Sequence, residues 1–211
     1  MSRSLLLFVR MTLFSLLLLA GLGQANATLL YDNGPINGNT TAYTINFGYL
    51  VSNSFTLNSA SSLSGAQIGL WMFPGDLPGT VDWSIGTSAF GTDITSGAGA
   101  GLADTFQYNN AFGYDIYESN FALNGALGAG TYWLTLQNAT TPSGSPMYWD
   151  QNSGPSQAFD SALGAVPSES FQIFGTTVSP VPEPASFVLL GAGLLGMIGY
   201  GWRRRHSTAS V

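Results

Sequence analysis

Residues 127–137 read Leu-Gly-Ala-Gly-Thr-Tyr-Trp-Leu-Thr-Leu-Gln, and the fold assignment starts from this stretch. Tyr132, Leu134 and Leu136 are separated by single residues that point the other way, which is the period of two expected of a strand with one buried face. The glycines before them supply the backbone freedom of a turn. The stretch therefore predicts a turn followed by a half-buried strand.

The same alternation recurs along the chain, and Gly- and Pro-rich turn sequences separate the segments that show it. No segment between the two ends sustains helical spacing over three turns. We therefore predict an all-β domain of about eight to ten strands, arranged as a two-sheet antiparallel sandwich with a jelly-roll-like order. The predicted strands include residues 43–51, 54–57, 65–73, 81–85, 114–123, 132–137, 146–149 and 171–174.

The distribution of charge excludes several classes of function. Lys and Arg total five, and no Lys, Arg, His or Cys occurs between Arg10 and Arg203. The intervening segment cannot neutralise a nucleic-acid backbone or clamp a phosphate, so we expect no nucleic-acid partner. It also lacks the residues of a Ser-His-Asp triad, a cysteine nucleophile, a Schiff-base lysine or a structural zinc site.

The chain has no cysteine, so disulfides do not stabilise it. About 150 residues between the two ends is enough to bury one core. The remaining chemistry is that of oxygen atoms, which suit hard cations such as calcium.

Residues 1–27 have the features of a secretory signal peptide. Arg3 and Arg10 give a positive start, an apolar stretch follows, and Ala25 and Ala27 form a small-x-small cleavage site for signal peptidase. The alternative is a retained N-terminal anchor.

Residues 187–202 form an uncharged apolar run at the other end of the sequence. With the two residues before it, this run spans about 27 Å as a helix, close to the thickness of a thin bilayer core. Arg203, Arg204 and Arg205 follow it and should stay on the cytoplasmic side. We therefore predict a transmembrane helix with a basic cytoplasmic tail; the alternative is a buried helix of a soluble protein.

Pro182, Glu183 and Pro184 lie just before the apolar run, in a segment, residues 180–186, that two prolines keep extended. The order Pro-Glu-Pro, apolar helix and arginine cluster resembles the PEP-CTERM protein-sorting signal. The resemblance implies that an exosortase, a membrane-embedded protease or transpeptidase, recognises these three residues as its substrate. A proline linker before an ordinary anchor is the alternative.

The predicted organisation follows from these signals. The protein is exported and anchored in the inner membrane with its domain in the periplasm, then reaches the cell surface or the extracellular matrix after processing. Pieces of the middle segment, residues 127–134, 148–150 and 169–175, also resemble β-sandwich ectodomains of PEP-CTERM proteins. The parts are a signal peptide (1–27), an ectodomain (28–179), the sorting motif (180–186), a transmembrane helix (187–202) and a basic tail (203–211).

Aromatic residues are candidates for binding sugar rings, because an exposed flat apolar face can stack on a pyranose. The candidates are Trp71, Trp133, Tyr148 and Trp149. Packing in the core of the sandwich is the alternative role for each of them.

Loop carboxylates and amides are candidates for calcium ligands, since the domain has surplus negative charge. The candidates are Asp32, Asn33, Asp76, Asp150 and Asn152, although no EF-hand pattern is present. Solvated loop side chains are the alternative, and no other cofactor is expected.

Together with the exopolysaccharide-rich surface context that the PEP-CTERM resemblance implies, these observations favour an exported surface or extracellular-matrix protein with a non-catalytic binding or structural domain. The first alternative is a carbohydrate-binding module, with or without calcium, that recognises exopolysaccharide. The second is a glycan hydrolase that uses the two glutamates of the domain, Glu118 and Glu169.

Overall fold

The computed structural model describes residues 27–178 and the single residues 191, 193, 195 and 197. Residues 27–178 form two antiparallel sheets, which confirms the predicted all-β class. Sheet A contains β1 (Thr28–Asp32), β2 (Ala42–Thr44), β4 (Ser61–Met72), β7 (Ala103–Asn109), β8 (Asp115–Ala122), β9 (Ala126–Leu127), β11 (Tyr148–Asp150) and β14 (Phe171–Thr177). Sheet B contains β3 (Val51–Leu57), β5 (Thr80–Gly86), β6 (Thr95–Gly101), β10 (Gly130–Thr140), β12 (Ala158–Asp160) and β13 (Gly164–Val166).

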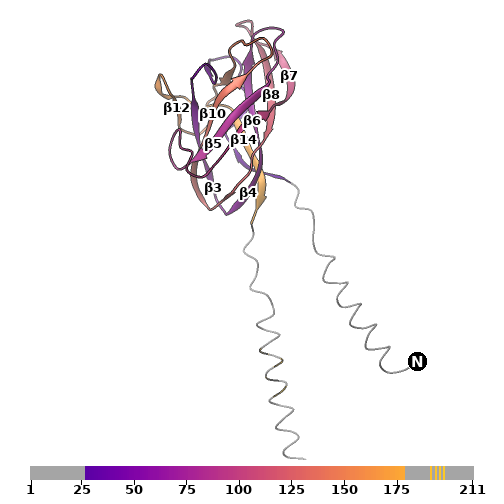
Figure 1. Cartoon of the computed structure of the whole chain (residues 1–211), viewed down its shortest axis with the longest axis vertical. Helices are drawn as coiled ribbons and strands as arrows, with labels where there is room; N and C mark the ends of the chain where they lie inside the picture. The colour runs from indigo at the N-terminus through magenta and orange to yellow at the C-terminus, as the bar shows by residue number, and fades with distance from the viewer. Residues whose placement is uncertain (1–26, 179–190, 192, 194, 196, 198–211) are drawn as a thin grey trace, which may run out of the picture. The chain divides into compact units, whose positions relative to one another are not determined.

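Four antiparallel strand pairs are nested inside one another along the chain, and Figure 1 shows the two sheets that they form. β1 pairs with β14, β3 with β10, β4 with β8, and β5 with β6. Successive pairs belong alternately to sheet A and sheet B. This nesting is a long hairpin wound into a sandwich, which is the strand arrangement of a jelly roll.

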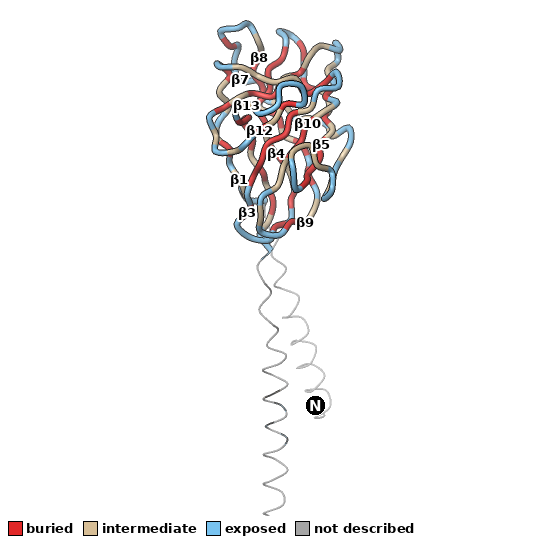
Figure 2. The backbone as a smooth tube through the Cα atoms, turned by 90° about the vertical axis from the view of Figure 1, so that its left-hand side faces the viewer, coloured by how far each residue is buried: buried red, intermediate tan, exposed pale blue. Residues whose placement is uncertain are grey.

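The core lies between the inner faces of the two sheets. Leu134 and Leu136 of β10 and Val81 and Ile85 of β5 are fully buried, as the alternation in the sequence predicts. Figure 2 shows buried backbone concentrated in the strands and exposed backbone in the turns. Each fully buried aliphatic side chain contributes about 1.5–3 kcal/mol through removal of its surface from water.

The predicted strand at residues 43–51 is wrong in its middle part. β2 ends at Thr44, and a turn follows in which Tyr49 N–H donates to Asn46 O at 3.1 Å. Phe47 and Gly48 have φ angles of 56° and 87°, so the chain cannot remain extended there. Phe47 is therefore exposed on a turn, although its place in the alternation predicted a buried face.

The two sorting signals lie mostly outside the described residues. The residues outside the description are the signal peptide up to residue 26, the Pro-Glu-Pro motif, and most of the apolar run. Four single residues of that run are described, and they have helical backbone. No helix within the described part of the chain is long and apolar enough to cross a membrane.

Candidate functional site

Asp150 fixes a loop over the outer face of sheet A. Its Oδ2 accepts a hydrogen bond from Asn37 N at 2.7 Å, and its Oδ1 accepts bonds from Gly38 N at 2.8 Å and Trp71 Nε1 at 2.6 Å. Burial raises the pKa of Asp150 above the ordinary aspartate value, while hydrogen bonds from Asn37, Trp71 and Gly38 oppose this effect. The carboxylate therefore holds both residues 33–41, named here the cover loop, and the indole ring of Trp71.

Asn110 fixes a second loop against the cover loop. Its Oδ1 accepts hydrogen bonds from Phe112 N at 3.0 Å and Tyr114 N at 2.9 Å. Its Nδ2 donates to Gly38 O at 2.9 Å. The turn between β7 and β8 thus has a defined conformation, and it carries two aromatic rings to the edge of the cover loop.

Five aromatic side chains meet on this face and are named the aromatic patch: Trp71, Phe73, Phe112, Tyr114 and Tyr148. Phe112 stacks on Trp71 with ring centroids 5.7 Å apart and planes at 20°. Tyr114 lies 5.5 Å from Trp71, 5.3 Å from Phe73 and 5.7 Å from Tyr148. Phe112 and Phe73 are 58% and 40% exposed, so the patch is open to solvent.

A hollow of about 310 Å³ lies between the aromatic patch and the cover loop. Trp71, Phe112, Tyr114 and Tyr148 line one side of it, and residues 40–42 line the other. The hydrogen bonds of Asp150 and Asn110 hold these walls in place without a ligand, so a bound molecule would not have to order them.

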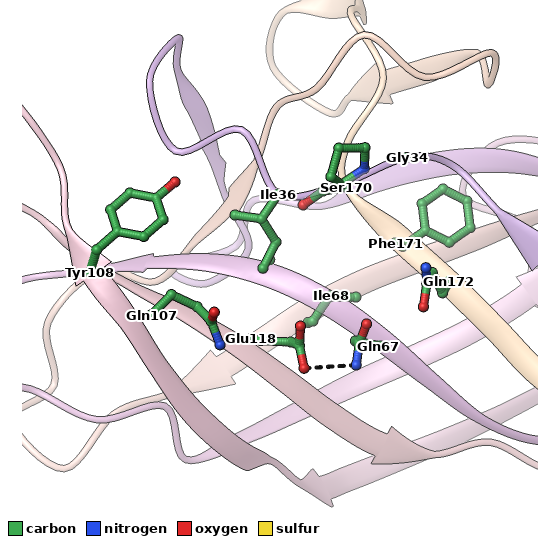
Figure 3. A pocket seen from close by; sticks show the side chains of 12 residues that line it. Gly34, Ile36, Gln67, Ile68, Gln107, Tyr108, Glu118, Ser170, Phe171 and Gln172 are labelled. Atoms are coloured by element: carbon green, nitrogen blue, oxygen red, sulfur yellow. Dashed lines mark hydrogen bonds between the residues drawn. The ribbon is translucent and has the colours of Figure 1, made fainter.

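A second hollow, named the polar pocket, lies on the same face of β4 and is lined by the first residues of the cover loop (Figure 3). Its volume is about 320 Å³. Gln67 of β4 donates from Nε2 to Glu118 Oε1 of β8 at 2.9 Å. The pocket is lined by Gly34, Pro35, Ile36, Gln67, Ile68, Gly69, Gln107, Tyr108, Glu118, Ser170, Phe171 and Gln172.

The structure separates the four aromatic residues that the sequence predicts to bind sugar. Trp71 and Tyr148 lie together in the aromatic patch. Trp133 lies on sheet B, where it packs on Phe159 at a centroid distance of 5.6 Å. Trp149 is fully buried and donates from Nε1 to the carbonyl of Ser170, so it offers no surface to a ligand.

Three of the predicted calcium ligands lie near the ends of β1 and β11: Asp32 is the last residue of β1, and Asn33 and Asn152 lie in the loops that follow the two strands. Asp32 Oδ1 accepts a hydrogen bond from Gly34 N at 2.8 Å. Asn152 Nδ2 donates to the carbonyl of Asn33 at 2.7 Å, and Asn152 Oδ1 accepts from Ser168 Oγ at 2.8 Å. The two asparagines are therefore neighbours, and their side chains join loops of the protein.

The other two predicted ligands, Asp76 and Asp150, also accept hydrogen bonds from the protein. Asp76 is bonded by Ser143 Oγ and by Leu77 N. Burial disfavours its charged form, but these bonds outweigh burial and lower the pKa of Asp76. Within the described residues no three acidic or other metal-ligating side chains lie close enough together to hold a metal ion. The calcium site remains a prediction.

The two glutamates considered for hydrolysis have different surroundings. Glu118 is half-buried in the wall of the polar pocket. Glu169 is fully buried, and neither carboxyl oxygen has a hydrogen-bond partner among the residues described. Burial raises the pKa of Glu169 well above its ordinary value, and repulsion from Asp150 and Asp160 adds to this effect.

Sequence reasoning missed most of the residues that build the two hollows. Phe112 and Tyr114 lie in the turn between β7 and β8; no periodicity marks Phe112, and the sequence predicts Tyr114 as the first residue of the strand 114–123. Gln67 and Trp71 share the outer face of β4, and the alternation of that strand carries this information. The pairing of β4 with β8, which brings Glu118 beside Gln67, has no local sequence signal.

Comparison with known proteins identifies the C-terminal segment. The family model of the PEP-CTERM protein-sorting motif matches residues 180–205, which contain the Pro-Glu-Pro sequence, the apolar run and the arginines. No curated protein matches the chain. The chain thus carries a PEP-CTERM protein-sorting motif, and this motif implies an exported protein that is sorted by an exosortase.

Proposed function

We propose that the protein is a surface or extracellular-matrix component whose β-sandwich is a non-catalytic module that binds exopolysaccharide. The aromatic patch supports this proposal. It presents Phe112 and Phe73 to solvent on a base that Asp150 and Asn110 hold rigid. Rigid aromatic rings next to a hollow suit the apolar faces of sugar rings.

The proposal that the module is not an enzyme rests on the chemistry of the two hollows. Hydrolysis of a glycosidic bond needs two carboxyl groups on either side of that bond. Glu118 is the one carboxylate that lines the polar pocket, and the aromatic hollow is lined by none. Glu169, the other glutamate of the domain, is fully buried.

The proposed route to the surface uses both ends of the chain. Signal peptidase cuts after Ala27, residues 187–202 hold the precursor in the inner membrane, and the arginines stay in the cytoplasm. An exosortase then acts near the Pro-Glu-Pro motif, so the anchor is temporary. Replacing Glu183 with alanine should block this step in a host that has an exosortase, and mass spectrometry of the mature protein reads its C-terminus. A normal C-terminus in this variant would contradict the proposed role of the motif.

Binding to polysaccharide is tested with the full-length protein, exported in a bacterial host and purified in detergent. The assay is a pull-down with cell polysaccharide, together with a glycan array. Phe112→Ala should weaken binding by about fivefold or more, equal to about 1 kcal/mol, because it removes the most exposed ring of the patch.

Leu163→Ala is the matched control, since Leu163 is 69% exposed on sheet B, in the turn between β12 and β13. It should bind as the wild type does. Equal losses in the two variants, or no binding of any glycan by the wild type, would refute the proposed function.

A further inference from the structure

The polar pocket contains hydrogen-bonding groups that the protein leaves free. Ser170 lies at the base of the pocket, but its hydroxyl is buried and offers no surface to a ligand. Glu118 receives the hydrogen bond of Gln67 on one carboxyl oxygen, and within the described residues its second oxygen accepts no hydrogen bond. The carboxamide of Gln172 lines the same pocket.

The absence of a side chain at Gly69 lets Ser170 pack closely against β4 at the base of this pocket. A Cβ atom at Gly69 would overlap Ser170 Oγ and would lie 2.8 Å from Ile36 Cγ1. The Ser170 hydroxyl therefore fills the space beside Gly69 on the outer face of β4. Ile36 of the cover loop lies close to it and also lines the pocket (Figure 3).

The lining of the pocket selects against anionic ligands. Carboxamides and hydroxyls both donate and accept, and the carboxylate of Glu118 accepts strongly from hydroxyl groups. No Lys, Arg or His exists between Arg10 and Arg203 to pair with an anion. A uronate or a phosphate would meet the Glu118 charge without a compensating cation, whereas a neutral hydroxyl-rich ring satisfies every group.

We propose that the polar pocket binds one uncharged sugar ring of a polysaccharide. Hydroxyl groups of the ring donate to Glu118 and exchange hydrogen bonds with Gln172, and the apolar face of the ring packs on Ile36. The volume of about 320 Å³ is near the lower end of the range for ligand sites, which fits a single ring. This inference rests on the proposed function, because it assigns a second subsite to the polysaccharide that the aromatic patch is proposed to bind.

The test uses isothermal titration of the full-length protein in detergent with neutral glucan, galactan and mannan oligosaccharides. Polygalacturonate and chitosan oligosaccharides are the anionic and cationic comparisons. Glu118→Gln should weaken binding of a neutral oligosaccharide by about tenfold or more, because hydrogen bonds to a charged group are the strong ones. Gln172→Ala should weaken it by about fivefold. Gln137→Ala is the matched control, since Gln137 is a half-buried glutamine on sheet B.

The variants separate failure of this inference from failure of the proposed function. If Phe112→Ala weakens binding while Glu118→Gln and Gln172→Ala bind as the wild type does, the polar pocket is not a subsite and the proposed function stands. Tighter binding of polygalacturonate or chitosan than of every neutral oligosaccharide would overturn the assignment of an uncharged ring. If no oligosaccharide binds the wild type, both proposals fail.

Discussion

Replacing Glu169 with glutamine should remove a large part of the pH dependence of stability. The side chain is fully buried, and its two carboxyl oxygens lack hydrogen-bond partners within the described residues. No cationic side chain between Arg10 and Arg203 is present to pair with it. The folded domain therefore favours the neutral acid, and the pKa of Glu169 lies well above the ordinary value of 4.5.

The sign of the effect follows from linkage between protonation and folding. Below pH 4.5 the carboxyl is neutral in both the folded and the unfolded chain, so Glu169 imposes no ionic penalty. Above this pH the unfolded chain releases the proton while the folded domain retains it. The free energy of unfolding then falls by about 1.4 kcal/mol per pH unit until the raised pKa of the folded domain is reached. Glutamine is neutral at every pH, so the Glu169→Gln variant lacks this fall in the free energy of unfolding.

Thermal unfolding followed by circular dichroism between pH 4 and pH 8 measures this difference. For a domain of this size about 1 kcal/mol corresponds to about 2–4 °C, so the melting temperatures of the variant and the wild type should diverge by about 3–6 °C per pH unit. A buried amide has its own cost of about 1–3 kcal/mol, but that cost does not change with pH. If the melting temperatures of the variant and the wild type differ by the same amount at every pH from 4 to 8, Glu169 is ionised or paired in the folded protein.

Three further changes test other parts of the structure. Gly69→Ala should lower the free energy of unfolding by about 1–3 kcal/mol in urea titrations, because the new methyl group overlaps Ser170 Oγ. Gly101→Ala is the control, since a Cβ atom there meets nothing within 4 Å. Equal stability of the two variants would contradict the close approach of Ser170 to Gly69. Asp93→Asn should act opposite in sign to the Glu169 variant: hydrogen bonds from Thr87 lower the pKa of Asp93, so its stabilising contribution is present above the ordinary value of 3.8 and is lost as the pH falls below it. If the difference in the free energy of unfolding between Asp93→Asn and the wild type does not change with pH in acid unfolding experiments, this reasoning is wrong. Adding EGTA should leave the melting temperature unchanged, because the candidate ligand oxygens already accept hydrogen bonds from the protein; a marked decrease would establish structural calcium.

The sequence predicts the strands where alternation and turn residues agree. In β10 Leu134 and Leu136 are fully buried and the glycines before them bound the strand as expected, although Thr135 between the two leucines is buried as well. Residues 43–51 show the same alternation but bend, because Asn46 leaves the ladder to bond the 145–147 segment through Ser145 O and Met147 N. A period of two indicates only that two faces differ, and long-range partners decide whether the chain stays extended.

The candidate site was less predictable because it depends on register. Tyr148 pairs with Trp71 and Trp149 with Leu70, which turns Tyr148 outward and Trp149 into the core. A shift of one residue would exchange the two rings, and nothing local in the sequence distinguishes these registers. Phe112 reaches Trp71 through a loop whose conformation depends on Asn110. Both contacts are visible only after the strands have paired.

The lack of cations between the two ends explains how this domain uses its carboxylates. Asp150 and Asp160 accept hydrogen bonds from backbone N–H groups, so acidic side chains hold loops where a salt bridge would hold them elsewhere. Such bonds compensate the buried charge without adding a positive side chain to the surface. Glu169 differs because it has no donor within the described residues, and it can remain buried only by keeping its proton. The surface that results has no group that attracts an anionic polymer, and for this reason the face that carries the aromatic patch is suited to a neutral glycan.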